Sequence, residues 1–127
     1  MHISKNDIPI KVNAPGAVAR QIPDFGIASG VMGAEYFTMK TGTDLAPLLE
    51  GLHDDACQSA HWGYVITGDV VVTYTDGVIE DCTKGEVFYW PPGHSVRVKN
   101  DAELILFSPQ TEHTLVMNHI LAKLANS

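Results

Sequence analysis

The chain has 127 residues, of which 45% are hydrophobic, and eight basic and fifteen acidic residues give it a formal charge of −7. This length is typical of a single hydrophobic core, so we expect one domain over residues 1–127. The hydrophobic content excludes a chain that is disordered throughout. The acidic balance disfavours nucleic acid and anionic membranes as partners, because both are negatively charged.

The first ten residues, MHISKNDIPI, lack the basic start and the apolar stretch of a secretory signal. No apolar run approaches the length that a membrane-spanning helix needs. We therefore expect a cytoplasmic protein. The cytosol is reducing, so Cys57 and Cys82 are expected to be free thiols, the first a candidate ligand and the second a buried apolar side chain.

The N-terminal part, residues 1–30, combines prolines with short β-prone pieces and is expected to form an arm of one or two edge strands. Residues 31–39 are aromatic and β-prone, which predicts a strand. The leucines in residues 41–51 are compatible with a helical turn or with a loop.

From residue 57 onward the pattern is one of short strands separated by turn residues, which is typical of a β-sandwich or barrel over residues 31–108. The expected strands are 57–67, 70–75, 78–82, 86–90, 94–99 and 103–107. The expected turns are Gly68–Asp69, Asp76–Gly77, Lys84–Gly85, Pro91–Gly93 and Asn100–Asp101.

A C-terminal helix over residues 109–125 is predicted, with Ser108 as its N-cap and Pro109 as its first residue. Its apolar residues are expected to form one stripe that packs on the barrel or on a second subunit. The stripe comprises Leu115, Val116, Ile120, Leu121 and Leu124.

Three potential metal ligands are expected to face one interior. Residues two apart in a strand share a face, so Cys57 and His61 are expected on the same side. His94 alternates with polar neighbours and shares a face with Val96 and Val98, which predicts that it also points inward.

Borderline-soft divalent metals prefer this combination of a thiol and two imidazoles, and three protein ligands with one open position is the form of a catalytic zinc site. Zinc is therefore the expected metal, with iron, nickel or copper as alternatives. A single buried cysteine or histidine is usually only packed in the core. Only the occurrence of Cys57, His61 and His94 together favours a metal site.

The segment HWGYVITGDVVV, followed by GEVFYWPPGHSVRV, resembles the two sequence motifs of the cupin superfamily, over roughly residues 55–98. The resemblance implies an all-β, jelly-roll (double-stranded β-helix) barrel that carries one metal ion in its interior. The spacing of Gly85, Pro91 and Gly93 follows the second motif closely. The chain is similar to small single-domain bacterial cupins.

The ligand positions depart from the family pattern. Aligned on the first motif, Cys57 lies where the family has its second histidine and His61 where it has glutamate, with Asp55 at the first histidine. His94 lies two residues before the usual histidine of the second motif, whose position is taken by Val96. The resemblance therefore implies an altered set of ligands.

Several other residues are candidates for a fourth ligand or a catalytic role. Asp55 and His53 would lie on the same face as Cys57 in an extended chain, so either could be the fourth ligand. A water molecule could be the fourth ligand instead. Glu35 and Tyr36 are neighbours in an expected strand, so one of them should face the interior as acid, base or ligand. No clear general base is evident. His113 and His119 are six residues apart in the helix, so they are not expected to share a metal ion.

These observations predict a metalloenzyme that acts on a small molecule inside the barrel. With zinc an isomerase, lyase or hydrolase is expected, and with iron a dioxygenase. The alternatives are a non-catalytic cupin that binds or senses a small molecule, and a trio that only stabilises the fold. A homodimer is also expected, because Trp62 and Tyr64 should lie on the outer face.

Overall fold

The computed structural model describes residues 1–126, so Ser127, the last residue of the expected domain, lies outside the described residues. Within residues 1–126 the chain forms an eight-stranded antiparallel sheet, two α-helices and two single 3-10 turns. The strands are β1 (Ile10–Ala14), β2 (Ala17–Ile22), β3 (Ile27–Ala28), β4 (Gly30–Met39), β5 (His61–Tyr74), β6 (Ile79–Thr83), β7 (Val87–Trp90) and β8 (His94–Pro109). The helical elements are η1 (Lys5–Asp7), α1 (Ala46–Leu49), η2 (His53–Asp55) and α2 (Gln110–Ala125).

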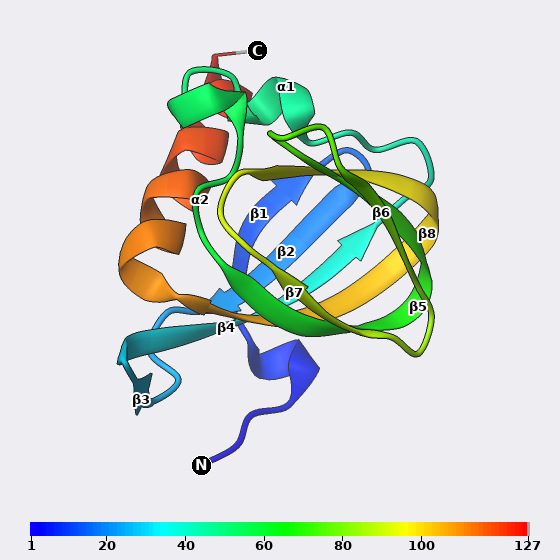
Figure 1. Cartoon of the computed structure of the whole chain (residues 1–127). Coiled ribbons are helices and arrows are strands. Elements are labelled where there is room, and N and C mark those ends of the chain that lie inside the picture. Colours follow the sequence, from blue (N-terminus) through cyan, green and yellow to red (C-terminus); the bar gives the residue numbers. More distant parts are fainter. Residues whose placement is uncertain (127) are drawn as a thin grey trace.

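The strand order is β1-β2-β4-β8-β5-β6, with β3 beside β4 and β7 beside β5. The sheet curls so that β5, β6 and β7 cross in front of β1, β2 and β4, while α2 runs along one side (Figure 1). This arrangement confirms the expected all-β class with a C-terminal helix. The sheet is not closed, however, because no hydrogen-bonded ladder joins β6 to β1 among the described strands.

The N-terminal strands belong to the main sheet. β1 lies at its edge, as expected, but β2 pairs on one side with β1 and on the other with β4. The prediction of an arm made only of edge strands is therefore wrong for β2. Pro15 lies in the turn between the two strands and Pro9 just before the first, so neither removes a hydrogen bond from the ladder.

Two expected turns are instead places where long strands bend. β5 continues through Gly68–Asp69 and β8 through Asn100–Asp101, and the pairing register between them shifts there. Asp69 pairs with Asn100, whose Nδ2 donates to Asp69 Oδ2 at 2.6 Å. The turn residues therefore form facing bulges, because pairing of β5 with β8 continues on both sides of them. The turns at Asp76–Gly77 and Lys84–Gly85 are confirmed.

Two apolar clusters form the core, one inside the curled sheet and one between the sheet and the helices. The segment that allowed a helical turn or a loop forms the short helix α1, which packs against α2. α2 begins at Gln110, one residue later than predicted, with Pro109 as its N-cap. None of the helices in residues 1–126 is long and apolar enough to cross a membrane.

The buried stripe of α2 differs from the predicted one. Leu115 is 68% exposed, so its assignment to the stripe is wrong. The buried residues of α2 itself are Gln110, His113, Val116, Met117 and Ile120. This stripe packs on the chain's own sheet and α1, so one of the two expected partners, the flank of the fold, covers it.

Candidate metal centre

Cys57 reaches the interior from a loop rather than from a strand. The predicted strand from residue 57 begins only at His61, which makes that prediction wrong at its start. Cys57 pairs instead with His94 through an isolated bridge: its N–H donates to the His94 carbonyl at 2.8 Å, and its carbonyl accepts from the Gly93 N–H at 2.7 Å. The backbone thereby holds the thiol beside the start of β8.

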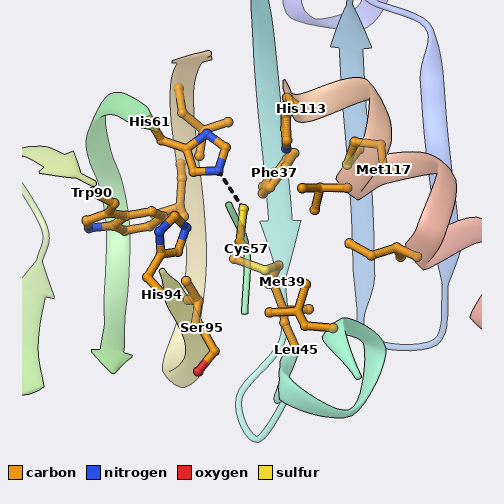
Figure 2. A pocket seen from close by; sticks show the side chains of 16 residues that line it. Phe37, Met39, Leu45, Cys57, His61, Trp90, His94, Ser95, His113 and Met117 are labelled. Carbon is orange, nitrogen blue, oxygen red and sulfur yellow. Dashed lines mark hydrogen bonds between the residues drawn. The ribbon is translucent and has the colours of Figure 1, made fainter. Parts of the chain in front are cut away.

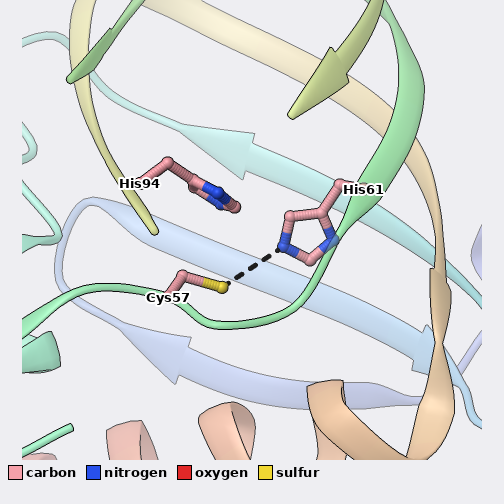
Figure 3. Close-up of side chains that lie close together, drawn as sticks. All are labelled: Cys57, His61 and His94. Carbon is pink, nitrogen blue, oxygen red and sulfur yellow. Dashed lines mark hydrogen bonds between the residues drawn. The ribbon is translucent and has the colours of Figure 1, made fainter. Parts of the chain in front are cut away.

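The structure brings the three predicted residues together (Figure 3). Cys57 Sγ lies 3.5 Å from His61 Nε2, and the rings of His61 and His94 have centroids 5.2 Å apart. One ligand atom from each residue lies within 4.8 Å of the other two. All three are at most 5% exposed, so water does not compete freely for them.

The tautomers of both histidines follow from their hydrogen bonds. His94 Nδ1 must donate to the Pro91 carbonyl at 2.7 Å, because a carbonyl oxygen only accepts. Ser108 Oγ donates to Glu35 Oε1 at 2.6 Å and so accepts from His61 Nδ1, also at 2.6 Å. Neither Nε2 atom therefore carries a proton, and His61 Nε2 accepts from the Cys57 thiol at 3.5 Å. Such outer hydrogen bonds orient metal-binding histidines in other proteins.

The distance between the Cys57 and His61 donor atoms suits a tetrahedral metal ion. With metal–sulfur and metal–nitrogen bonds of about 2.3 and 2.05 Å, a tetrahedral angle places sulfur and nitrogen about 3.6 Å apart. The distance from Cys57 Sγ to His61 Nε2 is 3.5 Å. The thiol and two imidazoles are also the ligands that borderline-soft cations prefer. The residues therefore fit the group that the sequence predicts.

Burial controls the protonation of all three groups. It lowers the pKa of His61 well below its ordinary value, with a further contribution from the nearby rings of His113 and His94. It lowers the pKa of His94 to about 4, against the opposing hydrogen bond to Pro91. It raises the pKa of the Cys57 thiol to about 11. Without a cation the trio is neutral, so binding must displace the thiol proton and should strengthen as pH rises.

We predict that the metal-free protein loses stability as pH falls. The pKa of His94 drops from 6.5 to about 4 on folding, so between these values the unfolded chain binds the proton and the folded chain does not. The contribution of His94 to the free energy of unfolding is fully present above pH 6.5 and is lost as the pH falls to about 4. At about 1.4 kcal/mol per pKa unit, His94 alone contributes up to about 3 kcal/mol. Urea unfolding at several pH values measures this, and a free energy that stays constant over this window would contradict it.

The other candidate ligands divide into exposed and buried residues. His53 and Asp55 are exposed, and Asp55 Oδ1 accepts from the Gly51 N–H at 2.9 Å, so neither joins the trio. Glu35 is fully buried, whereas Tyr36 is half-buried beneath the Lys5 ammonium. One member of the Glu35–Tyr36 pair therefore faces inward, as expected.

Two further side chains at the site, His113 and Ser108, were not predicted. His113 lies 4.6 Å from His61 between ring centroids, and Glu35, His61 and His113 form a second group that could hold a metal ion. His113 Nδ1 is 2.5 Å from Glu35 Oε1, an ion pair when the imidazole is protonated. The sequence did contain a signal for the inward direction of His113. This residue precedes Val116, Met117 and Ile120 at helical spacing, so it shares the buried face of the helix with them.

A small cavity of about 50 Å³ lies beside the trio (Figure 2). His113 and Met117 of α2 approach it from the side opposite Trp90 (Figure 2). Most of its wall is apolar. The apolar lining residues are Phe37, Met39, Leu45, Leu49, Trp90, Val96, Leu104, Leu106, Val116, Met117 and Ile120.

Three solved structures show what this arrangement resembles. An RmlC-like cupin from Shewanella frigidimarina is 24% identical, over 86% of this chain and 91% of that one, with a TM-score of 0.59. Ectoine synthase from P. lautus is 12% identical, over 87% and 78%, with a TM-score of 0.61. The polyketide cyclase RemF from Streptomyces resistomycificus is 16% identical, over 87% and 79%, with a TM-score of 0.59.

The chain has the cupin fold. No family model matches its sequence, and no curated protein does. The likeness to solved structures therefore concerns the fold. It confirms the resemblance that the two sequence motifs carried.

Within the cupin fold, the departures from the family motifs have clear structural counterparts. Asp55, at the position of the family's first histidine, is exposed and lies away from the cavity. Val96, at the usual position of the last histidine, is buried and lines the cavity. Only Cys57, His61 and His94 bring ligand atoms from these two motifs to one place.

Proposed function

We propose that the chain binds a divalent metal ion through Cys57, His61 and His94 and acts as an enzyme on a small molecule inside the cupin fold. One observation carries the proposal. The buried, neutral His61 presents Nε2 to the buried Cys57 thiol at 3.5 Å, and a ring nitrogen of the buried His94 lies within 4.8 Å of both ligand atoms. Three protein ligands leave a position for substrate or water, as in catalytic zinc sites.

Zinc suits the thiolate and imidazole ligands, and iron, nickel or copper are the alternatives. When bound, the cation would supply Lewis acidity to a substrate oxygen, which suits an isomerase, lyase or hydrolase, whereas iron would suit a dioxygenase. The chain's own residues prepare the site. Ser108 and Glu35 hold His61, the Pro91 carbonyl holds His94, and the apolar wall excludes bulk water.

The cavity also limits the substrate. Its volume of about 50 Å³ is well below that of the clefts, of roughly 300 Å³ or more, that enclose drug-sized ligands. A ligand of only a few non-hydrogen atoms fits without rearrangement. The wall offers His113 and Ser95 as polar groups away from the trio, so we infer a small substrate with few polar contacts.

Metal content tests this proposal. We expect about one zinc-type ion per chain at the trio, and at least a tenfold loss of affinity in Cys57→Ala or His61→Ala, because each removes a ligand. Cys82→Ala is the matched control, since Cys82 is also a buried free thiol but belongs to the sheet core. Elemental analysis after gel filtration measures the outcome. A metal-free parent protein, or undiminished metal in both ligand variants, would exclude the site.

A second candidate function is a cupin that binds or senses a small molecule without converting it. The mostly apolar wall of the cavity favours this alternative. His113 beside the cavity favours the enzyme, because it is a titratable group within reach of a bound molecule. A bound compound that is always recovered unchanged would support the binding function.

We also propose that the chain forms a homodimer. Trp62 and Tyr89 stack with ring centroids 5.1 Å apart on the outer face of β5 and β7, and they are 45% and 50% exposed. Tyr64 and Phe107 extend this aromatic face. Such a face on a small protein favours association with a second copy. Analytical ultracentrifugation that shows only a monomer would contradict this proposal.

A further inference from the structure

A second set of ligand atoms lies on the opposite side of the His61 ring from Cys57. We propose that Glu35, His113 and the Nδ1 side of His61 form a second divalent-cation site, so that the His61 imidazole is shared by two cations. One ligand atom from each of these residues lies within 4.8 Å of the others. The inference shares His61 with the proposed function but does not depend on Cys57.

The charge of Glu35 is the first argument. This side chain is 0% exposed, and only its Oε1 accepts a hydrogen bond, from Ser108. Its Oε2 has no hydrogen-bond partner among residues 1–126. A buried carboxylate costs several kcal/mol unless a cation or several donors compensate it. His113 Nδ1 lies 2.5 Å from Glu35 Oε1, an ion pair when the imidazole is protonated, and this contact is to Oε1 rather than to the unpaired Oε2.

A second buried oxygen without a hydrogen-bond partner in residues 1–126 lies near Glu35 Oε2. Gln110 donates its Nε2 to Thr114 Oγ1 at 2.7 Å, and its Oε1 has no hydrogen-bond partner in the described chain. A Cβ atom on Gly33 would overlap Gln110 Oε1 and would lie 3.3 Å from Glu35 Oε2. Both unpaired oxygens therefore lie over Gly33. Buried acceptors without partners call for a bound ion or water molecule, and a cation held by Glu35 would meet this need.

The ligand set differs from that of the Cys57 site. One carboxylate and two imidazoles, without sulfur, suit iron, manganese or cobalt as well as zinc. Binding would require His61 Nδ1 to give up the proton that it donates to Ser108, and this proton would leave to solvent. Glu35 and His113 would also move apart, because a nitrogen and an oxygen bound to one metal lie about 3 Å or more from each other.

Cobalt titration of the metal-free protein tests the inference. We expect two cobalt ions per chain, one of which gives a thiolate-to-cobalt charge-transfer band in the near ultraviolet. Cys57→Ser should keep one ion and lose the band. His113→Gln should keep one ion together with the band, and Glu35→Gln should also lose the second ion but bind the first more weakly, because Glu35 holds His61 through Ser108. His119→Gln is the control on the same helix, because His119 bonds the Glu50 carbonyl outside the cavity.

Gly33→Ala provides a variant that leaves every ligand in place. The three atoms nearest to the added methyl group belong to the flexible end of Gln110 and to the Glu35 carboxylate, so the fold should persist while the second ion is lost. Circular dichroism of each variant identifies any that fails to fold. If Glu35→Gln and His113→Gln both misfold, the Gly33→Ala result decides.

The outcomes separate this inference from the proposed function. A single ion that is lost in Cys57→Ser but kept in Glu35→Gln and Gly33→Ala would overturn the second site and leave the first. A single ion that is kept in Cys57→Ser but lost in Glu35→Gln would support the Glu35 site and overturn the function proposed for Cys57. Failure of the parent to bind any cobalt would overturn both.

Discussion

Replacing Gly68 with alanine is expected to destabilise the protein by about 3 kcal/mol. Gly68 has a φ of +82°, in the region that costs a residue with a Cβ roughly 1–2 kcal/mol. The new methyl group would also overlap the Asp101 carbonyl oxygen, which belongs to the backbone of β8. Backbone cannot move aside as a side chain can, so a further 1–3 kcal/mol, roughly, is expected from overpacking.

Gly77→Ala separates these two contributions. Gly77 has a similar φ of +90°, but a Cβ there would meet no atom within 4 Å. The control should therefore lose only the conformational part, roughly 1–2 kcal/mol. Urea unfolding of both variants measures the difference. Equal losses would show that the close approach of β5 and β8 at Gly68 does not matter for stability.

Trp90→Ala is expected to cost more, about 3–5 kcal/mol, which is typical of a large aromatic side chain removed from a core. Trp90 is 2% exposed, stacks on Phe88 with centroids 3.9 Å apart, and lies beside the His94 ring at 5.7 Å. Its loss would also free His94 to turn, so metal affinity should fall together with stability.

Trp62→Ala is the matched control. Trp62 precedes Gly63 in β5, but its side chain is 45% exposed on the outer face, where it contacts Tyr89. Its loss should cost less than about 1 kcal/mol and leave metal affinity unchanged. Thermal unfolding and metal titration of both variants test this. A destabilisation by Trp90→Ala as small as that by Trp62→Ala would mean that the wall behind His94 is not a critical part of the core.

Alternation and turn chemistry predicted much of the sheet. His94, Val96 and Val98 were expected on one face, and all three are buried. Local signals failed where pairing between distant strands competes with them. Gly68–Asp69 and Asn100–Asp101 have the composition of turns, yet the ladder between β5 and β8 continues through both. A turn signal does not reveal that another such segment lies opposite it.

Two parts of the site show what could and could not be predicted from the sequence. Cys57 was placed inward by strand parity, and it is buried there although it precedes the strand, because a backbone bridge to His94 holds it. The predicted inward direction of the Cys57 side chain was correct, but the reason given for it, membership of a strand, was wrong. The contact of His113 with Glu35 joins α2 to β4 across 78 residues of sequence, so it depends on tertiary packing that no local pattern encodes.

X-ray absorption at the zinc edge tests the central claim most directly. In protein loaded with one zinc ion per chain, we predict scattering from one sulfur at about 2.3 Å and from imidazole nitrogens at about 2.0–2.1 Å. The sulfur contribution should disappear in Cys57→Ser and remain in Cys82→Ser. A shell made only of nitrogen and oxygen in the parent protein would contradict a metal centre built on Cys57, His61 and His94.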